Sequence, residues 1–577
     1  MLLMANSYAV LHRVSFRDYD EEGTVAASTI PLQCFVPSRE DYTHLRETME
    51  TLVCQTLLLY FSTSVNDDSG CNPHIPHRYS AEMRTKSRLV NMGVIPEDPT
   101  TMAGVIRVTD VLLQYVPRLM NGRLYTIPCH ADALTVERIL DAKRARAAGH
   151  TKMERLQGVE PVPQEFHKRG VLLQDTMNLL FDACSAIDRG TLSNIKNVFN
   201  HRNLNKHVMG NFNDVDDFLH FVTDAMICTL ALQICSMESL DDTLTMNVTQ
   251  LAKSIVAHVW LQLPMADVAE VIDAEVDTSG QVDDEYTSID YPFCVCMEDI
   301  GTEMIACDNS ECDSGSWFHL GCVNLSESTF PQGTWFCCDN CKLSRPNISH
   351  LTGSRKDHVS EYSRSVLWRG LLDRAGRSAV REGDGAAMLR MWRVAMPDFW
   401  NNKHYKYLII GHRLLTGVAG WLPPRIAHDI TWNRTANLNG GAGNNVPLDR
   451  VCEFLDDDFQ VTLKHCGGSY TDAQIQRCGR IVGPLGKALD ERFSETVGKV
   501  ENRVKFCDLK KDWRADVAKF VHFYKSDQLF ADKPGRRHRA FPAFQHSLKI
   551  KNPELLKARL SSYSNKLDRQ RAVMIQD

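Results

Sequence analysis

Seven cysteines and one histidine lie close together in the middle of the chain, and all eight carry side chains that bind metal ions. They are Cys294, Cys296, Cys307, Cys312, His319, Cys322, Cys338 and Cys341. Their spacing is C-x-C, ten residues, C-x4-C, six residues, H-x2-C, fifteen residues and C-x2-C. Eight thiolate and imidazole ligands complete two tetrahedral sites, which is the closed geometry of structural zinc. The spacing therefore predicts two structural Zn²⁺ ions.

One ligand position stays open, because the run WFCCDNC allows either Cys337 or Cys338 to pair with Cys341. The two-residue gap from Cys338 suits a zinc knuckle better, so Cys338 is the predicted ligand. A segment of about 50 residues cannot bury enough apolar surface to be stable alone. Zinc binding would supply much of its folding free energy, on the order of 10 kcal/mol per ion.

The ligand order of four cysteines, a histidine and three cysteines resembles the plant homeodomain (PHD) finger. A RING-type ubiquitin ligase module would have its histidine fourth, so that class is disfavoured. The runs GTEMIACDNSEC, WFHLGCV and GTWFCCDNC look like the PHD fingers of the inhibitor-of-growth proteins. The resemblance implies a cross-braced arrangement with two sets of four ligands. These sets are Cys294, Cys296, His319 and Cys322 at one zinc, and Cys307, Cys312, Cys338 and Cys341 at the other.

The resemblance also implies a binding site for the tail of histone H3. In the similar fingers a trimethylated lysine lies in an aromatic cage, and the matching positions here are Phe293, Met304 and Trp317. A quaternary ammonium cannot donate a hydrogen bond, so ring faces would select it, at about 0.5–2 kcal/mol per contact. The peptide would add as a strand along TEMIA, with Asp308 or Glu303 facing an arginine of the tail.

The aromatic residues of this segment have a second possible role, which is packing. Trp317 could simply pack beside zinc instead of contacting a ligand. Phe318 and Trp335 are predicted to form the small core of the finger.

The cysteine-rich segment is predicted to interrupt a larger domain. Of the 577 residues 43% are hydrophobic and 24% charged, which is typical of globular proteins with several domains. The predicted fold class is mainly α with some β (α+β). The predicted parts are the first half of the large domain (1–270), an acidic linker (271–290), the PHD-type finger (291–343), a linker (344–360), the second half of the large domain (361–500) and a basic helical tail (501–577).

Charge and hydropathy indicate the compartment and the partners. The opening run MLLMANSYAVLHRVSF matches neither a signal peptide nor a membrane anchor, so we expect a soluble intracellular protein located in the nucleus and no membrane partner. The segment from Lys499 to Asp577 holds 19 Lys/Arg against 9 Asp/Glu. This tail could contact DNA, although a solvated helical surface explains it as well.

Four runs outside the finger resemble an uncharacterised family of animal and fungal proteins often associated with mobile elements. They are IPCHADALTVERILDAKRARA, EFHKRGVLLQDTMNLLF, REGDGAAMLRMWRVAMPDF and TWNRTANLNGGAGNNVPLDRVCEFL. GRLYTIPCHAD predicts a strand that ends at Asp132, before a helix near Thr135. A carboxylate there, joined by Asp175 or Glu453, could hold Mg²⁺ for transposase-like phosphodiester chemistry. This alternative function stays open, and we assign no enzymatic activity.

Two further patterns concern local structure. In VLLQDTMNLLFDAC (171–184) a helix would place Leu173, Met177, Leu180, Phe181 and Cys184 on one buried face. The run NGGAGNN (439–445) lacks the Lys-Ser/Thr of a phosphate-binding loop, so its glycines are predicted to form turns.

Overall fold

The protein is described from a computed structural model. The structure describes residues 5–19, 23–63, 74–118, 124–260, 304–307, 317–323, 325, 335–337, 356–465, 471–481, 507–545, 548 and 550–575. The chain forms two compact units. The main unit comprises Met1–Ala274 and Asp357–Asp577, and the small unit comprises Glu275–Lys356.

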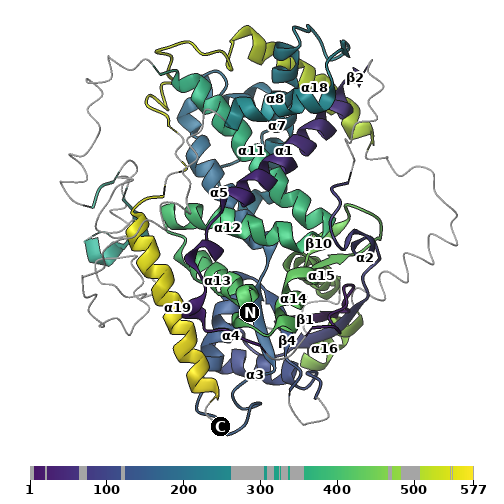
Figure 1. Ribbon diagram of the computed structural model, residues 1–577, viewed down its shortest axis with the longest axis vertical. Helices are drawn as coiled ribbons and strands as arrows, with labels where there is room; N and C mark the ends of the chain where they lie inside the picture. Colours follow the sequence, from purple (N-terminus) through teal and green to yellow (C-terminus); the bar gives the residue numbers. More distant parts are fainter. Residues whose placement is uncertain are drawn as a thin grey trace, which may run out of the picture. The chain divides into compact units, whose positions relative to one another are not determined.

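The largest hydrophobic core of the main unit lies among helices from both sides of the small unit in the sequence (Figure 1). These helices are α1 (Arg39–Tyr60), α5 (Glu165–Leu180), α6 (Leu192–Val198), α7 (Phe212–Ile234), α8 (Val248–Trp260), α11 (His358–Glu382) and α18 (Cys507–Ser526). Helix α7 packs against α1, α8, α11 and α18. The run Met209–Ile234 is long and apolar enough to cross a membrane, but 78% of its most apolar window is buried within the protein, as expected of a core helix.

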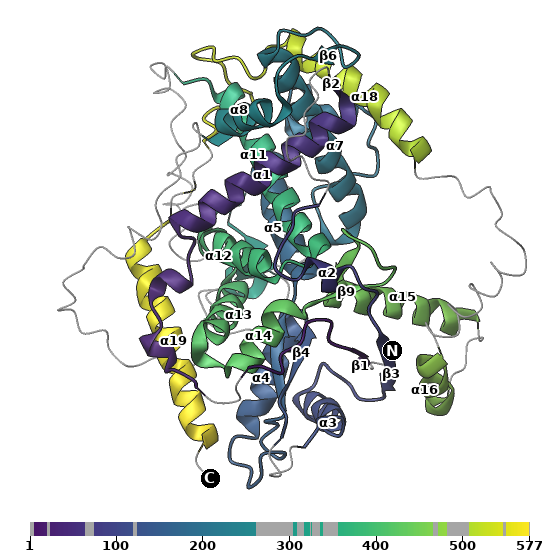
Figure 2. The ribbon, with the colours of Figure 1, turned by 45° about the vertical axis from the view of Figure 1, so that its right-hand side comes forward.

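A second core lies among one helix of the N-terminal half, the helices that follow α11 and the last helix of the chain (Figure 2). It is formed mainly by α4 (Ala133–Ala145), α12 (Gly385–Asn401), α13 (Tyr405–Thr416), α14 (Pro424–Trp432) and α19 (Pro553–Ile575). Leu556 and Leu560 of α19 are fully buried. The C-terminal segment therefore contributes apolar side chains to the main unit.

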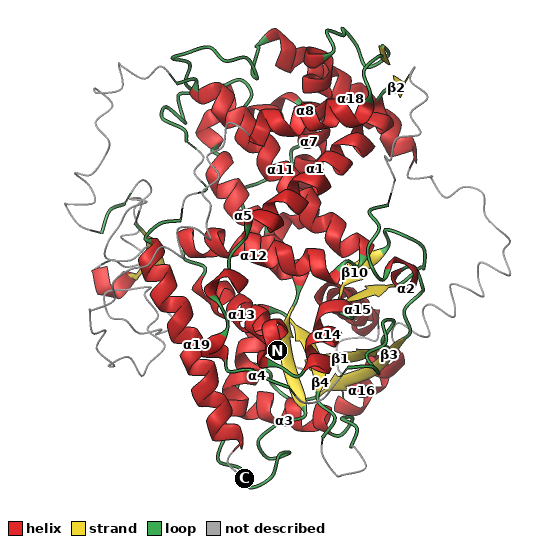
Figure 3. Cartoon of the chain, in the orientation of Figure 1, coloured by secondary structure: helices red, strands yellow, loops and turns green. Residues whose placement is uncertain are grey.

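The strands of the main unit are short and pair two by two (Figure 3). The pairs are β1 (Ala5–Val10) with β3 (Leu89–Ile95), β2 (Ser62–Thr63) with β6 (Thr243–Leu244), β4 (Ile127–Ala131) with β5 (Val159–Pro163), and β9 (Thr435–Asn437) with β10 (Asn445–Pro447). The other α-helices of the main unit in its described part are α2 (Ser80–Met83), α3 (Met102–Leu113), α15 (Leu448–His465) and α16 (Asp472–Ile481). The predicted class, mainly α with some β, is confirmed.

Strands β4 and β5 are parallel and are joined through helix α4. Asp132 directly follows β4 and begins α4, where its carboxylate accepts a hydrogen bond from the backbone N–H of Thr135 at 2.8 Å. Pro128 is tolerated inside β4 because, among the described residues, β4 pairs with β5 alone, which leaves one strand edge without ladder bonds. The carboxyl ends of both strands lie at one edge, beside the start of α5.

Helix α5 confirms most of the helix predicted over 171–184. Leu173, Met177 and Leu180 are buried on one face. Cys184 was wrongly placed on that face, because the helix ends at Leu180 and Cys184 is exposed. The side chain of Asp182 accepts a hydrogen bond from the backbone N–H of Cys184 and starts a separate 3₁₀ turn.

Candidate functional site

The described part of the small unit contains an antiparallel pair of strands, β7 (Met304–Ala306) and β8 (Trp317–His319). Ile305 lies opposite Phe318, and both side chains are buried. The rings of Phe318 and Trp335 contact edge to face, with centroids 5.6 Å apart. Phe318 and Trp335 therefore form part of a small apolar cluster, as the sequence predicted.

Three of the eight predicted zinc ligands fall on described residues. Cys307 is buried and follows β7, His319 ends β8, and Cys322 is partly exposed in the 3₁₀ turn after it. The backbone N–H of Cys337 donates to Sγ of Cys307 at 3.5 Å. Such a hydrogen bond suits a metal-bound thiolate, because supporting donors orient the ligands of metal sites. The other five predicted ligands lie outside the described residues, namely Cys294, Cys296, Cys312, Cys338 and Cys341.

Two of the predicted cage residues belong to the strand pair, Met304 in β7 and Trp317 in β8. In the register of the two strands Met304 is opposite His319, and Ala306 is opposite Trp317. Two more predicted peptide-binding residues, Phe293 and Asp308, lie outside the described residues.

Two of the three candidate catalytic carboxylates, Asp132 and Glu453, act electrostatically on the same group in the main unit, the ring of His167. The ring of His167 has Nδ1 3.1 Å from Asp449 and Nε2 3.5 Å from Glu453. Burial alone would lower the pKa of His167, but the hydrogen bond to Asp449 and the negative charges of Asp449, Asp132 and Glu453 raise it. Asp449 was not predicted as a site residue from the sequence. The one local feature that could have indicated it is its position in the first turn of helix α15.

These carboxylates already have structural partners. The two oxygens of Asp449 accept hydrogen bonds from the backbone N–H groups of Phe166 and His167 at the start of α5. Asp175 lies elsewhere and is bonded to His404, with 2.8 Å between Oδ1 and Nε2. Among the residues that the structure describes, no group of three or more His, Cys, Asp or Glu side chains fits a metal ion. The two-metal hypothesis stays a prediction.

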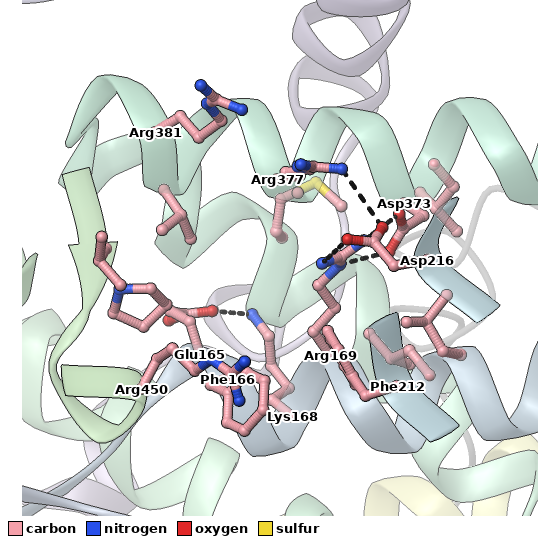
Figure 4. Close-up of a pocket in the computed structure, with 18 of the residues that line it drawn as sticks. Glu165, Phe166, Lys168, Arg169, Phe212, Asp216, Asp373, Arg377, Arg381 and Arg450 are labelled. Atoms are coloured by element: carbon pink, nitrogen blue, oxygen red, sulfur yellow. Dashed lines mark hydrogen bonds and ion pairs between the residues drawn. The ribbon is translucent and has the colours of Figure 1, made fainter. Parts of the chain in front are cut away.

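A pocket of about 420 Å³ opens between α5 and α11 in the main unit (Figure 4). The start of α7, one side of α12, the loop between β9 and β10, and the first turn of α15 complete its walls. Figure 4 shows Arg377 and Arg381 along one helix, with Phe166 and Arg450 across the cavity. Leu172, one of several apolar residues in the lining, contributes to a partly apolar wall.

The glycine-rich loop 439–445 forms part of this pocket. Gly440, Gly441 and Gly443 have φ values of +80°, +85° and +70°, so they are turn residues as predicted. Gly443 lines the pocket, and its carbonyl accepts a hydrogen bond from Nε of Arg381 at 2.9 Å. The sequence did not predict the pocket. The one sequence feature that could have indicated the pocket is the pair Arg377 and Arg381. These two like charges lie four residues apart on a helix and therefore repel.

The fold and these sites define a mainly helical protein of α+β class whose sequence is interrupted by a small cysteine-rich unit. The chain belongs to the family of unknown function DUF6589, whose family model matches residues 25–502. No solved structure matches the chain. The predicted association with mobile elements and transposases stays a prediction.

A short part of the chain is similar to inhibitor-of-growth proteins. Over 63 residues, 11% of this chain, it is 44% identical to inhibitor of growth protein 3 of Xenopus laevis and 41% identical to that of Homo sapiens. Over 55 residues, 9% of this chain, it is 46% identical to PHD finger protein ING1 of Arabidopsis thaliana. The chain spans 14% of each of the first two relatives and 22% of the third, so the similarity concerns one small part of them.

Proposed function

We propose that this protein is a nuclear, chromatin-associated protein whose segment 291–343 is a PHD finger that binds the tail of histone H3 with a methylated lysine. The observation that carries the proposal is the similarity of 41–46% identity to inhibitor-of-growth proteins and an ING-type PHD finger protein. The order and spacing of the eight ligands agree with it. For the whole protein, the proposal states only that it is targeted to chromatin.

Zinc would hold the finger together through two sets of crossed ligands. Cys294, Cys296, His319 and Cys322 would bind one ion, and Cys307, Cys312, Cys338 and Cys341 the other. Supporting observations are that Cys307 is buried beside an apolar cluster and that it accepts the backbone hydrogen bond from Cys337. Both features suit a closed structural site that excludes solvent.

The histone tail would bind along β7. Among the described residues β7 pairs only with β8, so its second edge offers backbone groups to an added strand. Met304 would supply an apolar wall of the cage, and Trp317 and Phe293 would supply its rings. A trimethylated lysine between them would be held by cation–π and apolar contacts. Asp308 would pair with an arginine of the tail.

The proposal is tested by titrating the full-length, zinc-loaded protein with H3 peptides that carry an unmodified or a trimethylated lysine. We expect trimethylated peptide to bind, Trp317→Ala to weaken that binding at least about tenfold, and Trp317→Phe to retain most of it, because phenylalanine keeps a ring face. Zinc content measured on each variant shows whether the finger is intact. If no H3 peptide binds a protein that carries two zinc ions, or if Trp317→Ala binds as the wild type does, the proposal is wrong.

A further inference from the structure

The pocket between α5 and α11 has more cationic than acidic side chains. Its lining contains six Lys or Arg side chains and four Asp or Glu side chains, which leaves an excess of two positive charges. The cationic side chains are Lys168, Arg169, Arg369, Arg377, Arg381 and Arg450, and the acidic ones are Glu165, Asp216, Asp373 and Asp398. Clustered cations in a concave site attract an anionic ligand, because low-dielectric walls concentrate their field.

The four carboxylates are already paired within the lining. Glu165 is paired with Lys168, and Arg169 binds both Asp216 and Asp373. Asp398 binds both terminal nitrogens of Arg369, at 2.6 and 3.2 Å. Because of these pairs, no acid in the lining is left for a remaining arginine alone.

Three arginines of the lining are left without a carboxylate of their own at ion-pair distance among the described residues. Arg377 reaches only Asp216, at 3.3 Å, and shares it with Arg169. In the part of the chain that the structure describes, no carboxylate lies within ion-pair distance of Arg381 or Arg450. Arg450 instead stacks on the ring of Phe166, 4.4 Å from its centroid.

The positive potential of this region also acts on neighbouring groups. Partial burial and the charge of Arg377 lower the pKa of Arg381, and the charges of Glu382 and Asp216 only partly oppose this shift. Burial, together with the charges of nearby arginines that include Arg377 and Arg381, lowers the pKa of His220 to about 2. In addition, Nε of the buried Arg369 has no hydrogen-bond partner among the described residues. Unmatched charge and an unmatched donor both favour a bound anion.

The size and walls of the pocket narrow the class of anion. A volume of about 420 Å³ lies within the usual range of small-molecule sites, roughly 300–1,000 Å³. Leu172, Met391 and Val394 provide an apolar wall, and Phe212 adds a ring. An inorganic ion would leave this apolar part empty. The ligand that uses both parts has an anionic end and an apolar or aromatic body.

We infer that this pocket binds a phosphorylated small molecule about the size of a mononucleotide, with its phosphate held by Arg377, Arg381 and Arg450. Guanidinium groups match phosphate oxygens with two parallel hydrogen bonds, and a phosphate dianion balances the two excess positive charges. The body of the ligand lies against the apolar wall. This inference does not depend on the finger or on histone binding.

The inference is tested on the full-length protein by isothermal titration and thermal unfolding with AMP, ADP and inorganic pyrophosphate. We expect at least one of the three to bind saturably and to raise Tm. Arg381→Gln and Arg450→Gln should each weaken that binding about tenfold or more, whereas Arg559→Gln, an exposed arginine of α19, should leave it unchanged.

Unfolding without ligand separates a binding role from a structural one. Arg381→Gln should change Tm of the unliganded protein little, because removal of a repelling charge offsets loss of the hydrogen bond to Gly443. Absence of binding by all three probes, or equal binding by the Arg381 and Arg559 variants, would overturn the inference. Binding of a single-stranded oligonucleotide through Arg381 and Arg450, without binding of the small probes, would overturn it in favour of a nucleic-acid site.

Discussion

A buried ion pair between Asp224 of α7 and Arg374 of α11 should be among the most sensitive positions of the main unit. The two side chains lie 2.6 Å apart and are 4% and 7% exposed. Tyr60 donates a hydrogen bond to the second oxygen of Asp224 at 3.0 Å, and Arg374 also donates to Thr56 of α1. The pair thus links the three helices α1, α7 and α11, and α7 and α11 carry some of the charged residues of the pocket.

Asp224→Leu leaves the guanidinium of Arg374 buried without its counter-charge. Breaking a buried pair in this way costs about 3–5 kcal/mol. The hydroxyl of Tyr60 also loses its acceptor, which costs about 1–3 kcal/mol more. We therefore expect the free energy of unfolding to fall by at least about 4 kcal/mol. The double variant Asp224→Leu/Arg374→Met removes both charges at similar volume, so it should lose much less.

The assay is guanidinium unfolding of the full chain, followed by circular dichroism and by tryptophan fluorescence. Coincident transitions are needed before free energies are compared, because the chain has two units. The double-mutant cycle of Asp224 and Arg374 gives the coupling energy, which should exceed about 2 kcal/mol. If Asp224→Leu costs less than about 1 kcal/mol, or if the double variant loses as much as the two single variants together, the pair does not stabilise the fold as argued.

Two further predictions concern the main unit. A Cβ at Gly370 would lie 2.0 Å from Oγ1 of buried Thr223, so Gly370→Ala should lower the free energy of unfolding by about 1–3 kcal/mol. A Cβ at Gly376, on the same helix, meets nothing closer than 3.7 Å, so Gly376→Ala should be neutral or stabilising. Similar losses of Tm in both variants would contradict this prediction. Because folding raises the pKa of His167, its protonated form stabilises the fold below about pH 6.5, and this contribution is lost as the pH rises through the raised pKa. His167→Gln should therefore lower Tm more at pH 6 than at pH 8, and equal losses at both values would refute the role of the Asp449 contact.

The sequence predicted features that depend on local spacing. The cysteines and the histidine could be recognised because metal ligands follow one another at short, fixed intervals. The sequence predicted a strand before the capping residue Asp132, and β4 ends one residue earlier, at Ala131. Phe318 was correctly assigned to the core of the finger. The helix end at Leu180 was missed because Phe181 and Cys184 continue the apolar pattern beyond the turn that Asp182 starts.

The pocket could not be predicted, because its charges come from segments far apart in the chain. Arg169, Arg377 and Arg450 approach one cavity only after α5, α11 and α15 have packed. In the sequence Arg377 and Arg381 are indistinguishable from charges on a solvated helix face. Only the structure reveals that Asp216, the acid within reach of Arg377, is already paired with Arg169.

The central claim, a cross-braced finger with two zinc ions, is tested most directly by the amount of zinc bound per chain, measured by elemental mass spectrometry on the purified full-length protein. We expect two ions in the wild type, two in Cys184→Ser, which changes an exposed cysteine of the main unit, and fewer than two in Cys307→Ser. A wild-type protein that binds less than one zinc ion per chain, or a Cys307→Ser variant that retains both, would contradict the account.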